Sequence, residues 1–264
     1  MGFRECMQEL ILLLLSFTIS TVASIVGLGG GVFYVPLLVL GFGFETKKAV
    51  STSLLAMSFT TVSATLAYAR QRRINYKIGI LLDLLDVPGT MVGVYLTTII
   101  SSKTLASLFG VFLLTVSFQL FRRAKNLGEP STDEEPKTDK LTAKMVYLAL
   151  FASFTSGVVA GMLGAGGGTV DETIMVLCMG MPVKVAAATS VFGMALTNTV
   201  AVILHFQVGN IVPLNYAVPI VIGGLCGSQL GPRISKRLEE ETMRRMLATV
   251  FILIALRMIA IPLL

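Results

Sequence analysis

The chain has 264 residues, of which 54% are hydrophobic and 14% charged, with a mean hydropathy of +0.82. Soluble domains carry roughly a quarter charged residues, so this composition excludes an ordinary soluble protein. The formal net charge of +6 comes from lysines and arginines in short intervals between apolar runs, which indicates a membrane protein and no nucleic-acid partner. The lipid bilayer is therefore the expected surrounding.

Ten apolar runs follow one another along the chain. Two of them, 32–43 and 169–181, are too short to cross a bilayer, which takes about 20 helical residues, and are predicted as half-helices. The others are 8–26, 49–69, 78–100, 104–121, 145–163, 185–206, 212–230 and 246–264. Alternating strands typical of a membrane barrel are absent, so the predicted fold class is an all-α polytopic membrane protein.

An internal repeat relates the two halves. At an offset of 137, residues 13–74 match residues 150–211 at 21 of 62 positions. The first apolar run is therefore a structural element and not a cleaved signal peptide, because its partner lies in mid-chain. Identical positions include Ser16/Ser153, Gly27/Gly164, Gly43/Gly180, Lys47/Lys184, Thr52/Thr189, Ser53/Ser190, Met57/Met194 and Thr60/Thr197.

The repeat divides the chain into a first transmembrane unit, 1–121, and a second, 141–264. Residues 122–140 between them are charged, contain prolines and lack periodicity, which is typical of a flexible linker. Basic residues gather at 70–77, in the linker region and at 231–245, while the loops near 101 and 209 have almost none. The positive-inside bias thus places the first three segments in the cytoplasm and the other two outside.

Corresponding loops of the two halves fall on opposite sides in this assignment. The loop at 70–77 is inside, whereas its repeat partner near 207–212 is outside. The halves are therefore predicted to be inverted copies, which requires an odd number of crossings in each. We expect three full spans per half plus one glycine-broken hairpin or half-helix element that enters and returns on the same side.

Each half-helix follows a run of glycines, "GLGGG" at 27–31 and "GAGGG" at 164–168. Paired discontinuous helices in inverted repeats indicate the substrate site of a transporter, and the free N–H groups at a helix start favour an anion. The alternative is that the glycines only allow close helix crossing. The substrate-binding residues predicted here are Gly29, Gly30 and Gly31 in the first run, and Gly166, Gly167, Gly168 and Thr169 in the second.

The segments "GLGGGVFYVPLLVLGFGFETKKAVSTS" and "GAGGGTVDETIMVLCMGMPVKVAAATS" resemble the two signature repeats of the sulfite exporter TauE/SafE family. The likeness covers nearly the whole chain apart from the linker. It implies a multi-pass permease of the cell membrane, not an enzyme, that exports sulfite or a small organosulfonate such as sulfoacetate. The second repeat departs from the family pattern, because Asp171, Glu172 and Thr173 stand where the first repeat has Tyr34, Val35 and Pro36.

Further polar residues are candidates for the same site. Thr52, Ser53, Thr189 and Ser190 begin the helices after the half-helices, and their hydroxyls could donate to sulfonyl oxygens or instead to backbone carbonyls. Asn198 carries an amide that needs partners within a membrane, either a substrate or a neighbouring helix. Lys47 and Lys184 are expected to anchor at the membrane interface, with guidance of the anion as the alternative.

Four acidic residues are candidates for coupling or gating: Asp83, Asp86, Asp171 and Glu172. Asp83 and Asp86 lie on one helix face, and a carboxylate within a membrane usually faces a cavity, pairs or binds protons. The alternative is an ion pair with a cation such as Arg257. The single histidine, His205, is expected at the outer surface rather than in a proton relay.

Other functional classes find less support. No HExxH motif and no nucleotide-binding fingerprint is present, and the three scattered cysteines form no CxxC pair, so neither a catalytic site nor a cofactor or metal is expected. A proton-coupled permease for another small anion remains an alternative, as does a cation or metal permease that uses the four acids as ligands. The sequence leaves the oligomeric state open.

Overall fold

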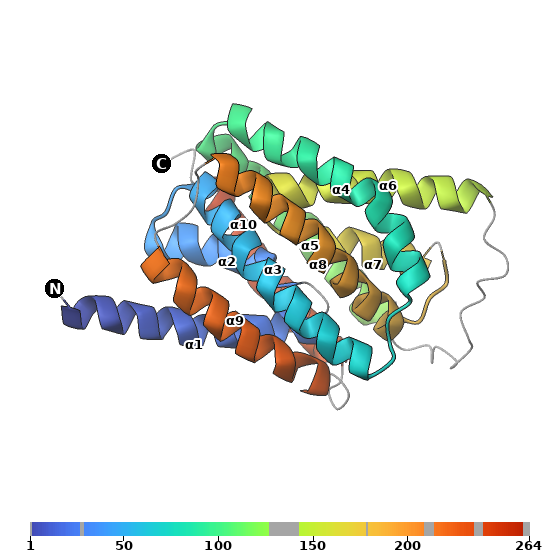
Figure 1. Ribbon diagram of the computed structural model, residues 1–264, viewed down its shortest axis with the longest axis horizontal. Helices are drawn as coiled ribbons and strands as arrows, with labels where there is room; N and C mark the ends of the chain where they lie inside the picture. The colour runs from blue at the N-terminus through green and yellow to red at the C-terminus, as the bar shows by residue number, and fades with distance from the viewer. Residues whose placement is uncertain are drawn as a thin grey trace.

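The computed structural model describes residues 2–26, 29–126, 143–177, 179–208, 214–234 and 240–260. All regular elements in these residues are helices (Figure 1). They are α1 (Gly2–Val26), α2 (Gly31–Pro36) with a π-helical turn η1 (Leu37–Gly41), α3 (Thr46–Arg70), α4 (Tyr76–Ile99), α5 (Ser102–Asn126), α6 (Ala143–Leu163), α7 (Gly168–Leu177), α8 (Val183–Val208), α9 (Leu214–Ile234) and α10 (Glu240–Ala260).

The two half-helices expected from the sequence are present as α2 with η1 and as α7. Glycines with positive φ mark both of their ends. Gly29 and Gly166 precede them with φ of 69° and 74°, and Gly43 and Gly180 follow them with φ of 68° and 63°. Because residues with a Cβ rarely adopt this left-handed conformation, the repeated glycines determine where each half-helix begins and ends.

Helix packing is reciprocal between the two halves of the chain. The helix α1 packs along α9 at one side of the molecule, and its repeat partner α6 packs along α4 at the opposite side (Figure 1). In the same way α3 contacts α9, and α8 contacts α4. The helices α3 and α8 pack against each other between these pairs, and α5 packs against α10. The strongest contacts of α1, α4, α6 and α9 thus cross from one half to the other.

Glycines allow the α4–α6 pair to come into backbone contact. A Cβ added at Gly157 would overlap the carbonyl oxygen of Asp86, and one at Gly161 would overlap that of Thr90. On the other side of the contact, a Cβ at Gly89 would overlap the Phe154 carbonyl. Such spacing of small residues is typical of closely crossing membrane helices.

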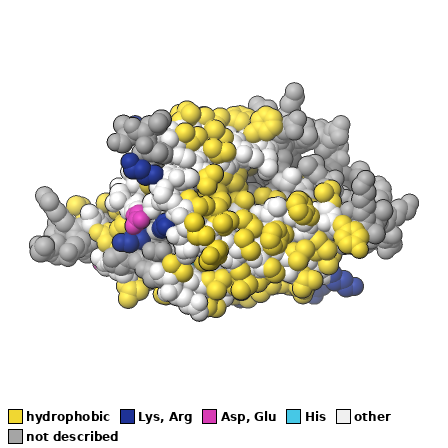
Figure 2. Space-filling model, turned by 90° about the horizontal axis from the view of Figure 1, so that it is seen from above, with side chains coloured by type: hydrophobic (Ala, Val, Ile, Leu, Met, Phe, Trp, Pro, Cys, Tyr) yellow, Lys and Arg dark blue, Asp and Glu magenta, His cyan; other side chains and the backbone are white. Residues whose placement is uncertain are grey.

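Apolar side chains cover the outside of the bundle. Figure 2 shows them over the middle of one face, with lysines and arginines toward its two ends. Leu84, Phe118 and Phe151 are each at least 60% exposed, which suits contact with lipid rather than with water. Within the described residues, 5 helices are long and apolar enough to cross a membrane, namely α1, α3, α4, α5 and α8. The protein is therefore a multi-pass helical membrane protein.

The linker prediction falls mostly on residues 127–142, which lie outside the described residues. The helix α5 extends to Asn126 and α6 begins at Ala143, so helical structure continues past the expected end of the first unit at 121. The loop at 209–213 and the segment at 235–239, both used for the predicted topology, also lie outside the described residues.

The close α4–α6 contact predicts an unusual response to Gly161→Ala. Alanine normally stabilises a helix interior by up to about 1 kcal/mol relative to glycine, but here the added methyl group would overlap the Thr90 backbone. We expect the free energy of unfolding to fall by about 1 to 3 kcal/mol through overpacking, measured as a lower thermal unfolding midpoint in detergent. Gly41→Ala is the control, because its Cβ would meet only a Leu37 methyl at 3.5 Å. Equal midpoints for the two variants would contradict this packing.

Candidate substrate site at the two glycine breaks

The two glycine breaks meet in the interior of the protein, around a pair of methionines that the repeat places at equivalent positions. A Cβ at Gly29 would lie 2.8 Å from both Met57 Cε and Met194 Sδ. A Cβ at Gly166 would meet the same two side chains. Residues 29 and 166 are separated by half of the chain, and the fold brings both against Met57 and Met194.

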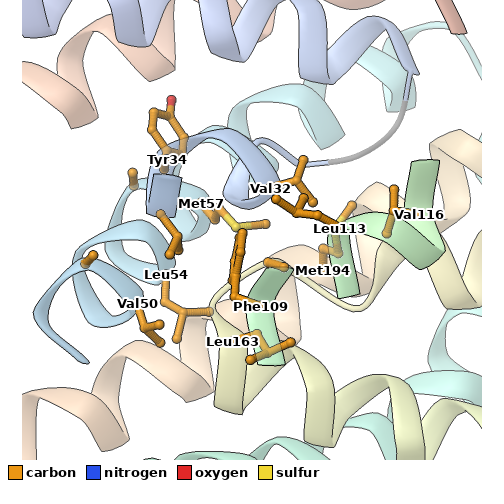
Figure 3. Packing of buried hydrophobic residues seen from close by; sticks show 14 of the residues in the cluster. Val32, Tyr34, Val50, Leu54, Met57, Phe109, Leu113, Val116, Leu163 and Met194 are labelled. Atoms are coloured by element: carbon orange, nitrogen blue, oxygen red, sulfur yellow. The ribbon is translucent and has the colours of Figure 1, made fainter. Parts of the chain in front are cut away.

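The first residues of the half-helices lie equally close. Gly31 is so near the backbone of Gly164 and Ala165 in the other break that it leaves no room for a Cβ. A Cβ at Gly168 would lie 2.5 Å from Met194 Cε and 2.7 Å from Ser190 Oγ. Figure 3 shows Met57 and Met194 within the buried cluster that also holds Val32 and Phe109. Thioether groups therefore fill the space between the two breaks.

Serine hydroxyls satisfy the carbonyl groups of the second break. Ser53 donates to Gly164 O at 2.7 Å, Ser156 donates to Gly167 O at 2.8 Å, and Ser190 donates to Gly168 O at 2.9 Å. A hydroxyl has a single hydrogen to donate. Ser53 thus holds the second break and Ser190 holds the first residue of α7 in this conformation, and a substrate would receive their hydrogens only after rearrangement.

The remaining predicted residues have various partners. Thr52 donates back to Lys48 O within α3 at 2.8 Å, and Thr189 accepts a hydrogen bond from the Asn75 N–H at 3.0 Å. Gly30 is the left-handed residue before α2, and the carbonyl oxygens of Gly30 and Gly167 accept the first helical hydrogen bonds of α2 and α7. The side chain of Thr169 lies outside the described residues.

Asn198 is the predicted site residue with an unmet hydrogen-bonding need. Its side chain is 0% exposed, and neither Oδ1 nor Nδ2 has a partner. It follows Met194 by one turn on the same face of α8, the face that meets the glycine breaks through Ser190 and Met194. Each unmet buried amide group costs about 1 to 3 kcal/mol, so this residue lowers the stability of the protein as it stands.

Three of the four predicted acids form one buried cluster, which we call the acid trio: Asp83, Asp86 and Asp171. Asp86 Oδ2 accepts a hydrogen bond from Thr197 at 2.6 Å, and Asp171 accepts from Ser153 at 3.2 Å. Asp171 Oδ2 also lies 3.1 Å from Ser156 Oγ, whose single hydrogen is shared between this oxygen and Gly167 O. The charge of Asp86 acts on Asp83, and the charges of both act on Asp171. Helices α4 and α7 thus bring together acids that lie far apart in the sequence.

The ion pair with Arg257 considered from the sequence is wrong. Arg257 is exposed on α10, which packs against α5, and within the described residues no cation pairs with the acid trio. Glu172 is also buried, but the charges acting on Asp171 come from the other two members of the trio. No group of three or more His, Cys, Asp or Glu residues suited to a metal ion occurs in the described part of the chain.

The surface position expected for His205 is also wrong, because α8 carries the ring into the interior. Its exposed fraction is 1%, Nδ1 lies 2.9 Å from Ser51 Oγ, and Nε2 lies 3.2 Å from Gly161 O. The repeat partner of His205 is Tyr68, which donates to Ser24 O, the partner position of Gly161. Of the two lysines expected at the interface, Lys184 is exposed and Lys47 is half-buried, with Lys47 Nζ donating to Thr98 O at 3.2 Å.

Two groups of residues were not assigned to the site from the sequence. Met57 and Met194 are identical positions of the repeat, and that identity was the available signal for a shared central role. Ser156 has no serine at its partner position, where the first half has Ile19. Its contacts with Gly167 and Asp171 therefore became visible only in the folded chain.

A multi-pass helical bundle with two broken helices meeting in its interior defines the class of membrane transporters. The sequence model of the family described as Sulfite exporter TauE/SafE matches residues 12–258. The chain therefore belongs to that family.

Relatives of known name agree with this class. The chain is 31% identical to "Probable membrane transporter protein YunE" of Bacillus subtilis, over 96% of this chain and 98% of that protein. It is 25% identical to "Probable membrane transporter protein MJ0441" of Methanocaldococcus jannaschii, over 91% of each. "Sulfite exporter TauE/SafE family protein 2" of Arabidopsis thaliana is 29% identical over 41% of this chain and 25% of that protein. No solved structure matches the chain.

The unmet amide predicts that Asn198→Leu stabilises the protein. Replacing a buried unpaired polar group by an apolar side chain of similar size removes a cost of about 1 to 3 kcal/mol. We expect a higher thermal unfolding midpoint in detergent. Thr61→Leu is the matched control, because Thr61, at the equivalent position of the first half, donates to Met57 O at 2.6 Å. A lower midpoint for Asn198→Leu would mean that the amide has partners within the protein.

Proposed function

We propose that this protein exports sulfite or a small organosulfonate anion, such as sulfoacetate, across the cell membrane. The substrate would bind where the two glycine breaks meet, at residues 29–31 and 166–169, with the amide of Asn198 as a hydrogen-bond donor. The helices α3 and α8 would enclose this site, and they carry the further candidate residues Thr52, Ser53, Thr189 and Ser190. The substrate class rests on the family resemblance and on the donor groups described above.

The observation that carries the proposal is the convergence of both breaks on Met194, one turn of α8 from the unpaired amide of Asn198. The first N–H groups of a helix have no acceptor within the helix, and they favour a negative charge. The start of α7 at Gly168 lies next to Ser190 and Met194. Met194 in turn lies one turn of α8 before Asn198. A sulfonate has several acceptor oxygens and can take hydrogen bonds from backbone N–H and amide groups together.

Membrane voltage favours movement of an anion in the export direction. With the cell interior negative, each negative charge that leaves gains about 2.3 kcal/mol per 100 mV. Export of a sulfur anion therefore needs no coupled ion in principle. A passive, potential-driven permease is sufficient to keep the internal concentration of such an anion low.

The transport cycle we propose is alternating access between inverted halves. Each half would contribute three full spans and one glycine-broken element, with the linker and the loop at 70–77 in the cytoplasm. The reciprocal packing of α1 with α9 and of α6 with α4 supports two equivalent moving units. In the described conformation the side chains of Met57 and Met194 fill the space between the two glycine breaks. Substrate entry would therefore require these flexible side chains to move aside.

Single cysteines test the inverted topology. In a variant whose 3 native cysteines are replaced by serine, we expect Arg72→Cys to react with a membrane-impermeant maleimide only in inverted vesicles. Lys103→Cys should react only in intact cells, because the loop near 101 is predicted outside. Both positions are exposed. Labelling of both from the same side would overturn the proposed topology.

Ligand-induced stabilisation tests the substrate class. Purified protein is heated with sulfite, sulfoacetate, sulfate, acetate or a divalent cation, and a ligand at 100 times its Kd adds about 2.7 kcal/mol to the stability of the folded state. We expect sulfite or sulfoacetate to raise the unfolding midpoint, and Asn198→Leu to abolish that rise. A response to divalent cations alone would favour the cation permease instead.

Uptake into proteoliposomes tests the role of the breaks. Gly29→Leu with Gly166→Leu should abolish anion flux, because both positions have positive φ and contact the methionines. Gly41→Leu, at an exposed position near the end of the first half-helix, is the control and should retain flux. Unchanged flux in the double variant, shown to be folded by its unfolding midpoint, would contradict the proposed site.

A further inference from the structure

The two halves of the protein build the same contact with different chemistry. In the first half, Tyr34 of α2 has its hydroxyl 2.9 Å from Ser16 Oγ of α1, and it also bonds to Ser20. In the second half, Asp171 of α7 accepts hydrogen bonds from Ser153 and Ser156 of α6. Tyr34 and Asp171 are equivalent positions of the repeat, as are Ser16 and Ser153.

The difference extends to the helix that packs behind each contact. Beside Tyr34, α9 presents Gly224, whose added Cβ would lie 3.0 Å from Tyr34 Oη and would touch Thr60. Beside Asp171, α4 presents Asp86, which accepts a hydrogen bond from Thr197, the repeat partner of Thr60. The first half thus forms this contact with neutral groups alone, so the shared fold does not require the charges found in the second half.

The acid trio contains buried oxygen atoms without hydrogen-bond partners, whereas the hydroxyl of Tyr34 in the first half has partners. Asp86 is 1% exposed and its Oδ1 has no hydrogen-bond partner, and Asp83 Oδ2 also has none. The helices around the trio present these ionisable groups: Asp83 and Asp86 on α4, Asp171 and Glu172 on α7, and His205 two turns beyond Thr197 on α8. The described face of α6 contributes Ser153 and Ser156. Carboxylates buried together without a cation are costly, and a bound proton supplies both a donor and a compensating charge.

We propose that the acid trio binds a proton, and that this proton strengthens anion binding at the second glycine break. The inference rests on the proposed function, since it concerns the same transport site. Ser156 connects the two places directly, because its hydroxyl contacts both Asp171 Oδ2 and the carbonyl oxygen of Gly167. Asp171 also lies one turn, about 4.5 Å along the axis, from the start of α7.

The sign of the coupling follows from charge. An ionised carboxylate one turn inside α7 repels an anion at the start of that helix and competes for the same positive helix end. Protonation removes this repulsion, so proton and anion bind better together than separately. Coupling between two ligands is reciprocal, and anion binding therefore draws a proton onto the trio. A divalent anion such as sulfoacetate that crosses with one proton still carries one net negative charge outward, so membrane voltage continues to favour its export.

Anion affinity measured as a function of pH tests the coupling. Sulfoacetate serves as the probe, because its sulfonate group remains ionised, and binding to the purified protein is followed by calorimetry from pH 5 to 8. For one linked proton, we expect the Kd to rise by up to about tenfold per pH unit as the trio loses its proton. In weakly buffered solution, we expect the protein to take up a proton on binding sulfoacetate.

Matched variants at the two equivalent positions identify the group responsible. Asp171→Asn keeps the shape but carries no charge, and we expect it to bind sulfoacetate tightly at all these pH values with no proton uptake. Tyr34→Phe alters the neutral counterpart, and it should keep the pH dependence of the wild type. The unfolding midpoints of the two variants report whether each is folded. Proton uptake is measured on the wild-type protein, so that part of the test does not depend on a variant folding correctly.

Each outcome separates the two proposals. Binding of sulfoacetate with the same Kd at every pH and no proton uptake would overturn the proton site while leaving the anion site in place. Absence of binding of any sulfur anion would overturn the proposed function itself. A dependence of the wild-type Kd on sodium instead of pH would show that the trio binds a metal cation and not a proton. Equal loss of pH dependence in Tyr34→Phe would also count against the trio.

Discussion

Backbone that leaves helical geometry inside a membrane must find its hydrogen-bond partners within the protein, because lipid offers none. The rest of this structure depends on that constraint. Serines from α3, α6 and α8 donate hydrogen bonds to the carbonyl oxygens of Gly164, Gly167 and Gly168, and Gly167 O also accepts from the first turn of α7. These contacts draw three helices from both halves around one short segment, and so the helix break itself holds the centre of the bundle together.

At the centre of the bundle the two halves place residues at equivalent positions, but some of the side chains at these positions differ. Met57 and Met194 take equivalent places and contact both breaks, while Tyr34 and Asp171 take equivalent places with different side chains. The contact of α2 with α1 and the contact of α7 with α6 can therefore hold the same helix packing while only the second contains an acidic residue. This separation allows the second half to acquire an ion-binding role without disturbing the helix packing, for which the first half serves as an internal reference.

The polar residues of the centre also divide into those that stabilise and those that do not. Ser53, Ser156, Ser190 and Thr197 donate hydrogen bonds to carbonyl or carboxylate oxygens, and these bonds stabilise the fold. Asn198 and two oxygens of the acid trio are buried without partners, which lowers stability. Such groups are tolerated where a ligand completes them, and their concentration beside the second break is the physical basis of both proposals.

The sequence by itself determined the helical membrane class, the two half-helices and the approximate bounds of the other helices, because composition, run length and repeated glycines act locally along the chain. It also identified Asn198 and the acids as polar residues in apolar surroundings. Only the tertiary structure decided what those residues face. His205 is buried because α6 supplies Gly161 and α3 supplies Ser51, and Arg257 is remote from the acids because α10 packs on α5. Contacts between distant helices depend on how apolar faces and glycine surfaces fit together, which no local pattern records.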